Sequence, residues 1–442
     1  MSDFDLLVRS GQDIGISDGK FVAIGPNLRG SAVEEFDATG LAVFAGVIDA
    51  HVHFNEPGRT DWEGFETGSQ AAAVGGTTTV FDMPLNAHPP TIDARSFDVK
   101  HAAAEQNSIV DFGLWGGLVP GNSSQLQALR DRGVVGLKAF MCNSGIEDFP
   151  SVDRATLREG MRIAADLEML VAVHAESEEM TRALTETRLA AGRTTVADYL
   201  ESRPSEAELE AIRSAIELAH ETGCRLHVVH VSCGSGVELV AEARAKGVDV
   251  TCETCPHYLV LCETDMQDIG ATAKCAPPLR SIAEQRDLWS RLPDVTTIGS
   301  DHSPSPPEMK QGSNFFEVWG GISSCQHLLP LLVNAAQDPG QEVTHEQIAG
   351  WTSRNVAERF RIAAKGGIAL GKDADLTFMD PENGDMILAG TLRYRHRQSP
   401  YLGHKLRCRV VRTILRGQTI FDGVNITARA GGRFVRPDPS DS

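Results

Sequence analysis

The stretch Gly46-Val-Ile-Asp-Ala-His51-Val-His53 decides the fold, because it is a short apolar run that ends in two histidines. Side chains alternate along a strand, so His51 and His53 point to one face, as two imidazole ligands of one metal would. An open, doubly wound sheet would usually carry a glycine-rich phosphate loop after its first strand instead. A His-x-His pair alone is a weak signal, since two histidines beside a turn fit it equally well.

Seven further β-type runs follow, with helix-type stretches between them. They end near Met83, Trp115, Phe140, His174, His230, Cys252 and Asp301. The eight runs span about 255 residues, and a (β/α)8 barrel typically takes about 250. Glycines 75 and 76 predict the end of a helix over residues 62–74, and Ser205-x-x-Glu208 has the form of a capping box for a helix over residues 205–223.

Both ends of the chain have the pattern of short β-strands, over residues 5–45 and 371–434, with turn signals such as Asp18-Gly19. We expect the two ends to pair into one small domain. The fold class is therefore α/β. The predicted division is a barrel over residues 47–368 and a β domain built from residues 1–46 and 369–442.

Composition excludes several classes of protein. The 442 residues include 41 Lys+Arg and 60 Asp+Glu, a net charge of −19, which argues against partners such as nucleic acid or an anionic membrane. No apolar run approaches the roughly 20 residues of a membrane helix, and the start lacks the pattern of a secretory signal. Nine cysteines, an odd number, make a disulfide framework improbable, so we expect a cytoplasmic protein.

The residues that close the runs carry the chemistry, because the active site of a barrel lies at the C-terminal ends of its strands. Histidines, a lysine and an aspartate stand there: His51, His53, Lys138, His174, His230 and Asp301. His174 alone would more often be a core histidine. Asp301 could be a metal ligand, a general base or a helix cap. His227 and His230 face opposite ways on a strand, so we expect His230 in the site and His227 packed outward.

Lys138 ends an apolar run, where a charged amine would be costly to bury. A snorkelling or acid-paired lysine is the plain interpretation. The functional one is an amine whose pKa is strongly shifted or which is modified, and a carbamate formed from CO2 could bridge two cations.

Other motifs rank lower. Cys252-x-x-Cys255 has no second pair at zinc-site spacing, so both are expected to be buried thiols. His257 and His302 lie beside the expected site and are expected to support ligands or substrate.

The ordered set from His51 to Asp301 resembles the metal-dependent amidohydrolases, and within them the cyclic-amide branch, which carries a carboxylated lysine between two metals. The resemblance covers almost the whole chain and implies a small β-sandwich made of the two chain ends, which Gly371-Lys-Asp-Ala-Asp-Leu376 would re-enter.

Within this branch, local motifs resemble the allantoinases. They are His53-Phe-Asn-Glu-Pro-Gly-Arg-Thr-Asp-Trp-Glu-Gly64, Met83-Pro-Leu-Asn86, Phe140-Met-Cys-Asn-Ser-Gly-Ile-Glu-Asp-Phe-Pro150, Asp301-His-Ser-Pro-Ser-Pro-Pro-Glu308 and Trp319-Gly-Gly-Ile322. Dihydroorotases have an arginine where this chain has Asn55, and hydantoinases have a tyrosine where it has Asn143. Both departures lower the expectation of those sister activities.

The resemblance implies zinc-dependent hydrolysis of the ring amide of allantoin to allantoate in purine catabolism, with Co²⁺, Ni²⁺ or Mn²⁺ able to replace Zn²⁺. His51, His53 and Asp301 would hold one metal, and His174 and His230 the other. Lys138, as N6-carboxylysine formed with CO2, would bridge them, and Asp301 would move the proton.

Substrate contacts are expected from Asn143, Ser144, Ala276 and Gly320, the last two through backbone groups. The resemblance also implies a homotetramer. A hydantoinase or dihydropyrimidinase is the nearest alternative. A catalytically silent scaffold is a distant one, because all six ligand positions are filled.

Overall fold

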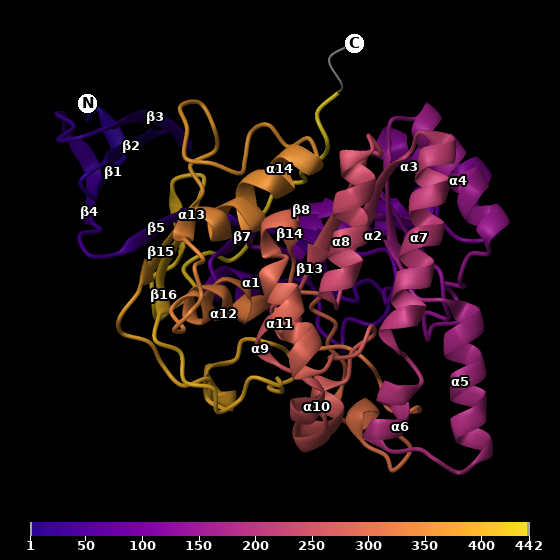
Figure 1. Ribbon diagram of the computed structural model, residues 1–442. Coiled ribbons are helices and arrows are strands. Elements are labelled where there is room, and N and C mark those ends of the chain that lie inside the picture. The colour runs from indigo at the N-terminus through magenta and orange to yellow at the C-terminus, as the bar shows by residue number, and fades with distance from the viewer. Residues whose placement is uncertain (1, 440–442) are drawn as a thin grey trace.

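The computed structural model describes residues 2–439, and its centre is a ring of parallel strands with helices around it (Figure 1). The strands are β6 (Val47–Val52), β7 (Thr77–Asp82), β8 (Asp111–Leu114) continued by β9 (Gly116–Gly117), β10 (Leu137–Phe140), β11 (Leu170–His174), β12 (Arg225–Val228), β13 (Val250–Thr254) and β14 (Thr297–Ile298). Neighbouring strands pair in parallel, and a parallel bridge from Val52 to His302 closes the ring. The predicted (β/α)8 barrel is confirmed.

The barrel strands are buried on both faces, as parallel strands between a packed interior and a helical layer must be. The interior cluster includes Ile48, Phe81 and Ala172, whereas Val171 and Val173 of β11 belong to the outer layer. The helices are α1 (Phe65–Val74), α2 (Ala94–Asn107), α3 (Leu126–Arg132), α4 (Arg154–Asp166), α5 (Glu178–Ala190), α6 (Val196–Glu201), α7 (Ser205–Thr222), α8 (Gly234–Ala245), α9 (Pro256–Val260), α10 (Glu263–Ile269), α11 (Ile282–Ser290), α12 (Leu328–Ala336), α13 (His345–Ala349) and α14 (Asn355–Arg359). Within residues 2–439, no helix has the length and apolar character needed to cross a bilayer.

Two helix starts differ from the sequence prediction. Helix α1 ends before Gly75 as expected but begins only at Phe65, because Gly64 has a φ of 92° that ordinary helical residues avoid. The prediction of a capping box at the start of α7 is wrong. Pro204 is the N-cap there, and the Glu208 carboxylate turns away to accept from the Arg280 guanidinium at 2.9 Å.

Two four-stranded sheets flank the barrel. The first contains β1 (Phe4–Arg9), β2 (Asp13–Ser17), β3 (Lys20–Gly25) and β4 (Ala32–Asp37), and the second contains β5 (Ala42–Ala45), β15 (Leu376–Asp380), β16 (Arg409–Leu415) and β17 (Gln418–Phe421). β5 pairs antiparallel with β15, which joins the two ends of the chain, as the indigo and yellow strands of Figure 1 show. Division at residues 46/47 and 368/369 remains our proposal; residue 1 and residues 440–442 lie outside the described residues.

An ion-pair cluster ties the second sheet to the barrel. The Lys365 amine is 3% exposed and donates to Asp111 of β8 at 2.7 Å, Asp375 at 2.7 Å and Asp373 at 3.1 Å. Arg416, in the turn between β16 and β17, pairs with the other oxygen of Asp111. The buried carboxylates are therefore held by cations from the C-terminal part of the chain.

Replacing Lys365 with methionine should destabilise the protein. Removing one partner of a buried ion pair typically costs about 3–5 kcal/mol, because the remaining charges lose their compensation. Denaturant unfolding measures the change. Lys20→Met is the matched control: this amine also pairs with Asp373 but is 43% exposed, so its loss should cost less than about 1 kcal/mol. Equal effects of the two variants would contradict a buried, interdependent cluster.

Candidate metal centre and active site

Six side chains converge where the barrel strands end. His51 and His53 lie at the end of β6, Lys138 lies in β10 and His174 ends β11. His230 and Asp301 follow the ends of β12 and β14, and both have a positive φ, of 40° and 46°. Left-handed backbone is uncommon outside glycine and clusters at functional sites. At these two positions the side chains meet His174 at 3.0 Å and His51 at 3.2 Å.

The first ligand group contains two histidines and the aspartate. Asp301 Oδ1 lies 3.2 Å from His51 Nε2 and 3.6 Å from His53 Nε2. The three ligand atoms lie within 4.8 Å of one another, close enough to hold one ion. On the other ring edge, His51 Nδ1 lies 2.7 Å from the buried Glu253 carboxylate. That contact fixes the ring and leaves Nε2 for the site.

The second group is a pair of facing rings. His174 Nδ1 lies 3.0 Å from His230 Nε2, and the two ring centroids are 4.6 Å apart. His174 Nε2 lies 2.8 Å from Glu176, which also pairs with Arg203. Burial would raise the pKa of Glu176, but Arg203 and His174 lower it to about 2. An ionised glutamate thus holds the outer nitrogen of His174 and leaves Nδ1 facing His230.

The two groups adjoin each other. The His51 and His230 ring centroids are 5.4 Å apart. Burial, as the largest cause, lowers the pKa of both histidines well below its usual value. Neutral imidazoles carry the lone pair that a metal needs.

Lys138 completes the set and fits a divalent-metal site. Its side chain is fully buried, and Nζ has no hydrogen-bond partner among residues 2–439. Burial lowers its pKa to about 8, although Asp301 and Glu253 oppose this shift. The amine is therefore neither snorkelling nor hydrogen-bonded to an acid. An unpaired, readily deprotonated amine beside two sets of ligand atoms suits a modified lysine that bridges two cations.

The prediction that His227 packs outward is wrong. Its register partner on β11 is Ala172 of the interior cluster, and its ring lies 5.8 Å from Phe360 of the same cluster. His227 Nδ1 bonds to Thr251 Oγ1 at 2.8 Å. The alternation argument failed because β12 ends at Val228, after which the positive φ of His230 turns a second histidine inward.

The expected substrate residues lie in loops around the site. Asn143 is exposed, and its side-chain oxygen accepts from Gly145 N at 2.9 Å. The Ser144 hydroxyl donates to the Phe149 carbonyl at 2.6 Å, so both side chains shape their own turn. Ala276 and Gly320 are half-buried, and Gly320 adjoins Lys274. Contact with substrate through these residues stays a prediction.

The supporting carboxylates were missed by sequence reasoning. Glu253 pairs with His51, which lies 202 positions earlier in the sequence, so no local motif predicts the contact. The available signal was a charged residue inside the β-type run of β13. Two residues after His174, Glu176 was a similar signal. His257 lies beside the site as expected: its ring is fully buried, and burial lowers its pKa to about 4 while the Asp301 charge opposes this.

Comparison with known protein families identifies the family to which a chain with this site belongs. The model of the amidohydrolase family matches residues 42–420. The chain belongs to the amidohydrolase family. Two curated relatives named allantoinase are similar to it over nearly their whole length. They are from Rubrobacter xylanophilus, 54% identical over 99% of this chain and 98% of the relative, and from Solibacter usitatus, 51% identical over 96% and 93%.

Solved structures similar to this amidohydrolase include proteins named hydantoinase or dihydropyrimidinase. The L-hydantoinase (dihydropyrimidinase) from Arthrobacter aurescens has a TM-score of 0.95 at 34% identity, over 98% of this chain and 100% of that one. The dihydropyrimidinase from Brevibacillus agri has a TM-score of 0.90 at 32% identity, over 99% of both chains. Similarity to hydantoinases is therefore strong in backbone and weaker in sequence.

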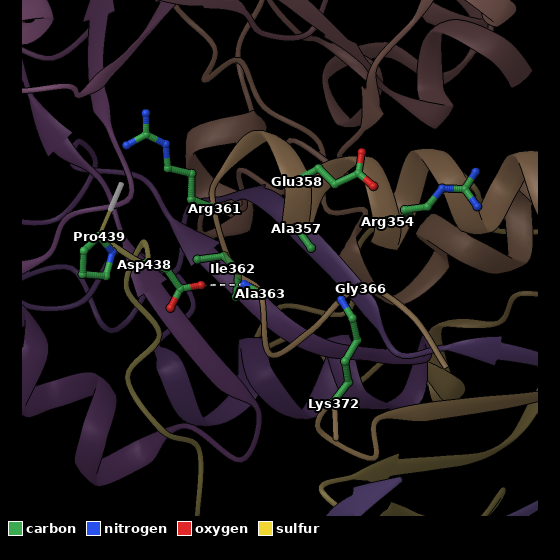
Figure 2. Close-up of a pocket in the computed structure, with 10 residues that line it drawn as sticks. All are labelled: Arg354, Ala357, Glu358, Arg361, Ile362, Ala363, Gly366, Lys372, Asp438 and Pro439. Atoms are coloured by element: carbon green, nitrogen blue, oxygen red, sulfur yellow. Dashed lines mark hydrogen bonds between the residues drawn. The ribbon is translucent and has the colours of Figure 1, made fainter. Parts of the chain in front are cut away.

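A cavity of about 470 Å³ lies at the opposite end of the amidohydrolase barrel, beside α14 (Figure 2). Ala357 of its lining packs with Ile48 and Val135, at the starts of the strands. Figure 2 shows Arg354 and Arg361 pointing to opposite sides. None of the six converging side chains lines this cavity, so it is separate from the site.

Loss of His230 should remove one of the two proposed metals. His230→Ala takes a nitrogen ligand from the second group and should lower bound metal by about half, together with most activity. His227→Asn is the matched control, since asparagine can keep the bond to Thr251; it should retain metal. Metal analysis after dialysis measures both. Metal loss in His227→Asn but not in His230→Ala would reverse the assignment.

Proposed function

We propose that the chain is an allantoinase, which hydrolyses the ring amide of allantoin to allantoate. The observation that carries this conclusion is that curated allantoinases are 42–54% identical to the chain over nearly its whole length. The convergence of His51, His53, Lys138, His174, His230 and Asp301 gives that similarity a chemical basis.

We infer that two divalent metals, Zn²⁺ above the alternatives Co²⁺, Ni²⁺ and Mn²⁺, belong to the site. His51, His53 and Asp301 would hold one, His174 and His230 the other, and Lys138, carboxylated by CO2, would bridge them. When bound, such metals polarise a carbonyl group and lower the pKa of water. The nitrogens and carboxylate of the site are the donors that Zn²⁺ takes in proteins.

The residues of the chain then handle protons and orientation. In the overall reaction the water oxygen adds to the ring carbonyl carbon, the C–N bond breaks and the ring nitrogen gains a proton. Asp301 would accept the proton from water and deliver it to the leaving nitrogen. Burial opposes ionisation of Asp301, but the facing rings of His51 and His53 hold its pKa well below the usual value, so the carboxylate is ionised.

The choice of substrate is supported by Asn55. This residue is fully buried two positions after His53, and its amide donates to the Pro304 carbonyl at 3.3 Å, in the loop after Asp301. A neutral amide suits an uncharged ureide, whereas a carboxylate substrate such as dihydroorotate would need a cation for a charge-assisted bond. Asn143, Ser144, Ala276 and Gly320 are proposed to contact the substrate from the surrounding loops.

We further propose a homotetramer located in the cytoplasm. The second candidate function is a hydantoinase, which the backbone similarity to L-hydantoinase, with a TM-score of 0.95, favours. Both activities would share the ring-opening chemistry of the same six residues, and the loops would distinguish them.

A substrate panel tests the assignment. With metal-loaded protein, allantoin should exceed hydantoin, dihydrouracil and dihydroorotate in kcat/KM by at least about tenfold, or roughly 1.4 kcal/mol of differential transition-state binding. Steady-state rates on all four compounds give the comparison. Equal rates on hydantoin and allantoin would remove the allantoinase assignment and leave the amidohydrolase family intact.

Lys138→Ala tests the proposed bridge. The variant should lose most bound metal and nearly all activity, because only a carbamate supplies two oxygens that reach two ions. Acetate or propionate could enter the vacated space and restore part of both. Loading the wild-type apoprotein without CO2 should give less activity than loading with bicarbonate. Full metal content and near-normal turnover in Lys138→Ala, without added carboxylate, would show that the lysine is no bridge.

A further inference from the structure

Two lysines outside the metal centre each bind three backbone carbonyls. Lys274, which is 4% exposed, donates from Nζ to the carbonyls of Phe315 at 2.6 Å, Val318 at 2.6 Å and Phe316 at 3.4 Å. Lys310 donates to the carbonyls of Ala271 at 3.0 Å, Trp319 at 3.0 Å and Gly321 at 2.6 Å. Five of these six carbonyls belong to one loop, residues 315–321.

An ammonium group is suited to this arrangement, because it has three N–H donors and no acceptor. No carboxylate of residues 2–439 forms a salt bridge with either amine. The Lys274 amine lies 4.7 Å from the Tyr199 ring centroid, which adds a cation–π contact. Burial lowers the pKa of both amines to about 7, so charge is disfavoured here and the carbonyls are what offset it. Both lysines therefore bind the backbone of the loop rather than a carboxylate of the described residues.

The C-terminal end of the loop lies beside the segment that follows Asp301. Gly321 N donates to the Lys274 carbonyl at 2.7 Å. Ser303, two residues after Asp301, donates from its backbone N to the Ile322 carbonyl at 2.9 Å. Gly321 has a φ of 139°, and a Cβ there would lie 2.3 Å from the Ser303 carbonyl oxygen. The loop thus has little freedom at the end nearest the site.

At its centre the loop reaches the barrel mouth. The Trp319 ring lies 4.9 Å from the Trp62 ring, in the segment after His53. Trp319 also packs on the interior cluster that contains Phe140, two residues after Lys138. Its indole nitrogen is buried and has no hydrogen-bond partner within the described residues. An uncharged ureide could accept a hydrogen bond from this buried N–H group, which lies next to Gly320.

We infer that Lys274 and Lys310 are positioning residues, which hold the 315–321 loop over the barrel mouth and so set affinity and selectivity for the substrate. The inference rests on the proposed ring-amide hydrolysis. Each lysine binds a different part of the loop. Lys274 donates to carbonyls within residues 315–318, and Lys310 donates to the carbonyls of residues 319 and 321. Loss of either would leave buried carbonyls without donors, which the loop can remedy only by moving toward water.

The test uses Lys274→Met and Lys310→Met in the metal-loaded holoenzyme. Bound metal and kcat should stay within about threefold of wild type, while KM for allantoin should rise at least about tenfold. The ratio of kcat/KM on allantoin to that on hydantoin should fall in parallel, since hydantoin lacks the ureido group. Lys274→Arg and Lys310→Arg keep a cationic donor and should recover part of the KM.

Lys372→Met is the matched control. Its amine donates to the Lys365 carbonyl at 2.7 Å and lines the cavity at the far end of the barrel (Figure 2). It should change neither KM nor selectivity.

Three outcomes would overturn the inference: unchanged KM in both methionine variants, the same KM rise in Lys372→Met, or metal loss that accounts for all lost activity. If wild type fails on allantoin, the proposed substrate is wrong. The KM comparison is then made on whichever panel compound it hydrolyses. A rise there still supports the loop assignment, and no rise refutes it.

Discussion

The buried amine of Lys138 is the constraint on which the rest of the site depends. Taking an unpaired ammonium out of water is expensive, so the residue is acceptable only as a neutral or modified group. The surrounding histidines must be neutral for the same reason, and burial keeps them so. The carboxylates of Glu253 and Glu176 then decide which ring nitrogen of His51 and His174 faces inward. A barrel provides this arrangement because all its strands end at one face.

The sequence predicted what depends on periodicity and strand ends. Eight apolar runs gave the barrel, and the polar residues that close them gave the six side chains that converge. Contacts set by distant pairing could not be read in this way. Glu253 meets His51 only when closure of the ring brings β13 and β6 to either side of β14. His230 joins His227 on the inner side because a left-handed residue ends the alternation. The Ser205 capping box failed because Glu208 finds a stronger, charged partner in Arg280.

Backbone and sequence similarity point to different members of one family. An L-hydantoinase shares nearly the whole backbone at 34% identity, whereas an allantoinase shares 54% of residues. This difference is expected when relatives use one ring-opening chemistry and differ in what they exclude. We propose that the barrel and its six converging side chains carry the chemistry, and that the loops around Asn55, Asn143 and Trp319 distinguish the substrates.

The pairing of β5 with β15 has a consequence for synthesis of the protein. β5 (Ala42–Ala45) precedes the barrel and β15 (Leu376–Asp380) follows it, so the ribosome must deliver the entire barrel before β5 meets its partner. During that interval the strand presents open N–H and C=O groups to other nascent chains. Arg416, which pairs with the buried carboxylate of Asp111, also emerges after the barrel. A message cut short after the barrel would therefore encode every ligand of the metal centre and still release an aggregation-prone chain.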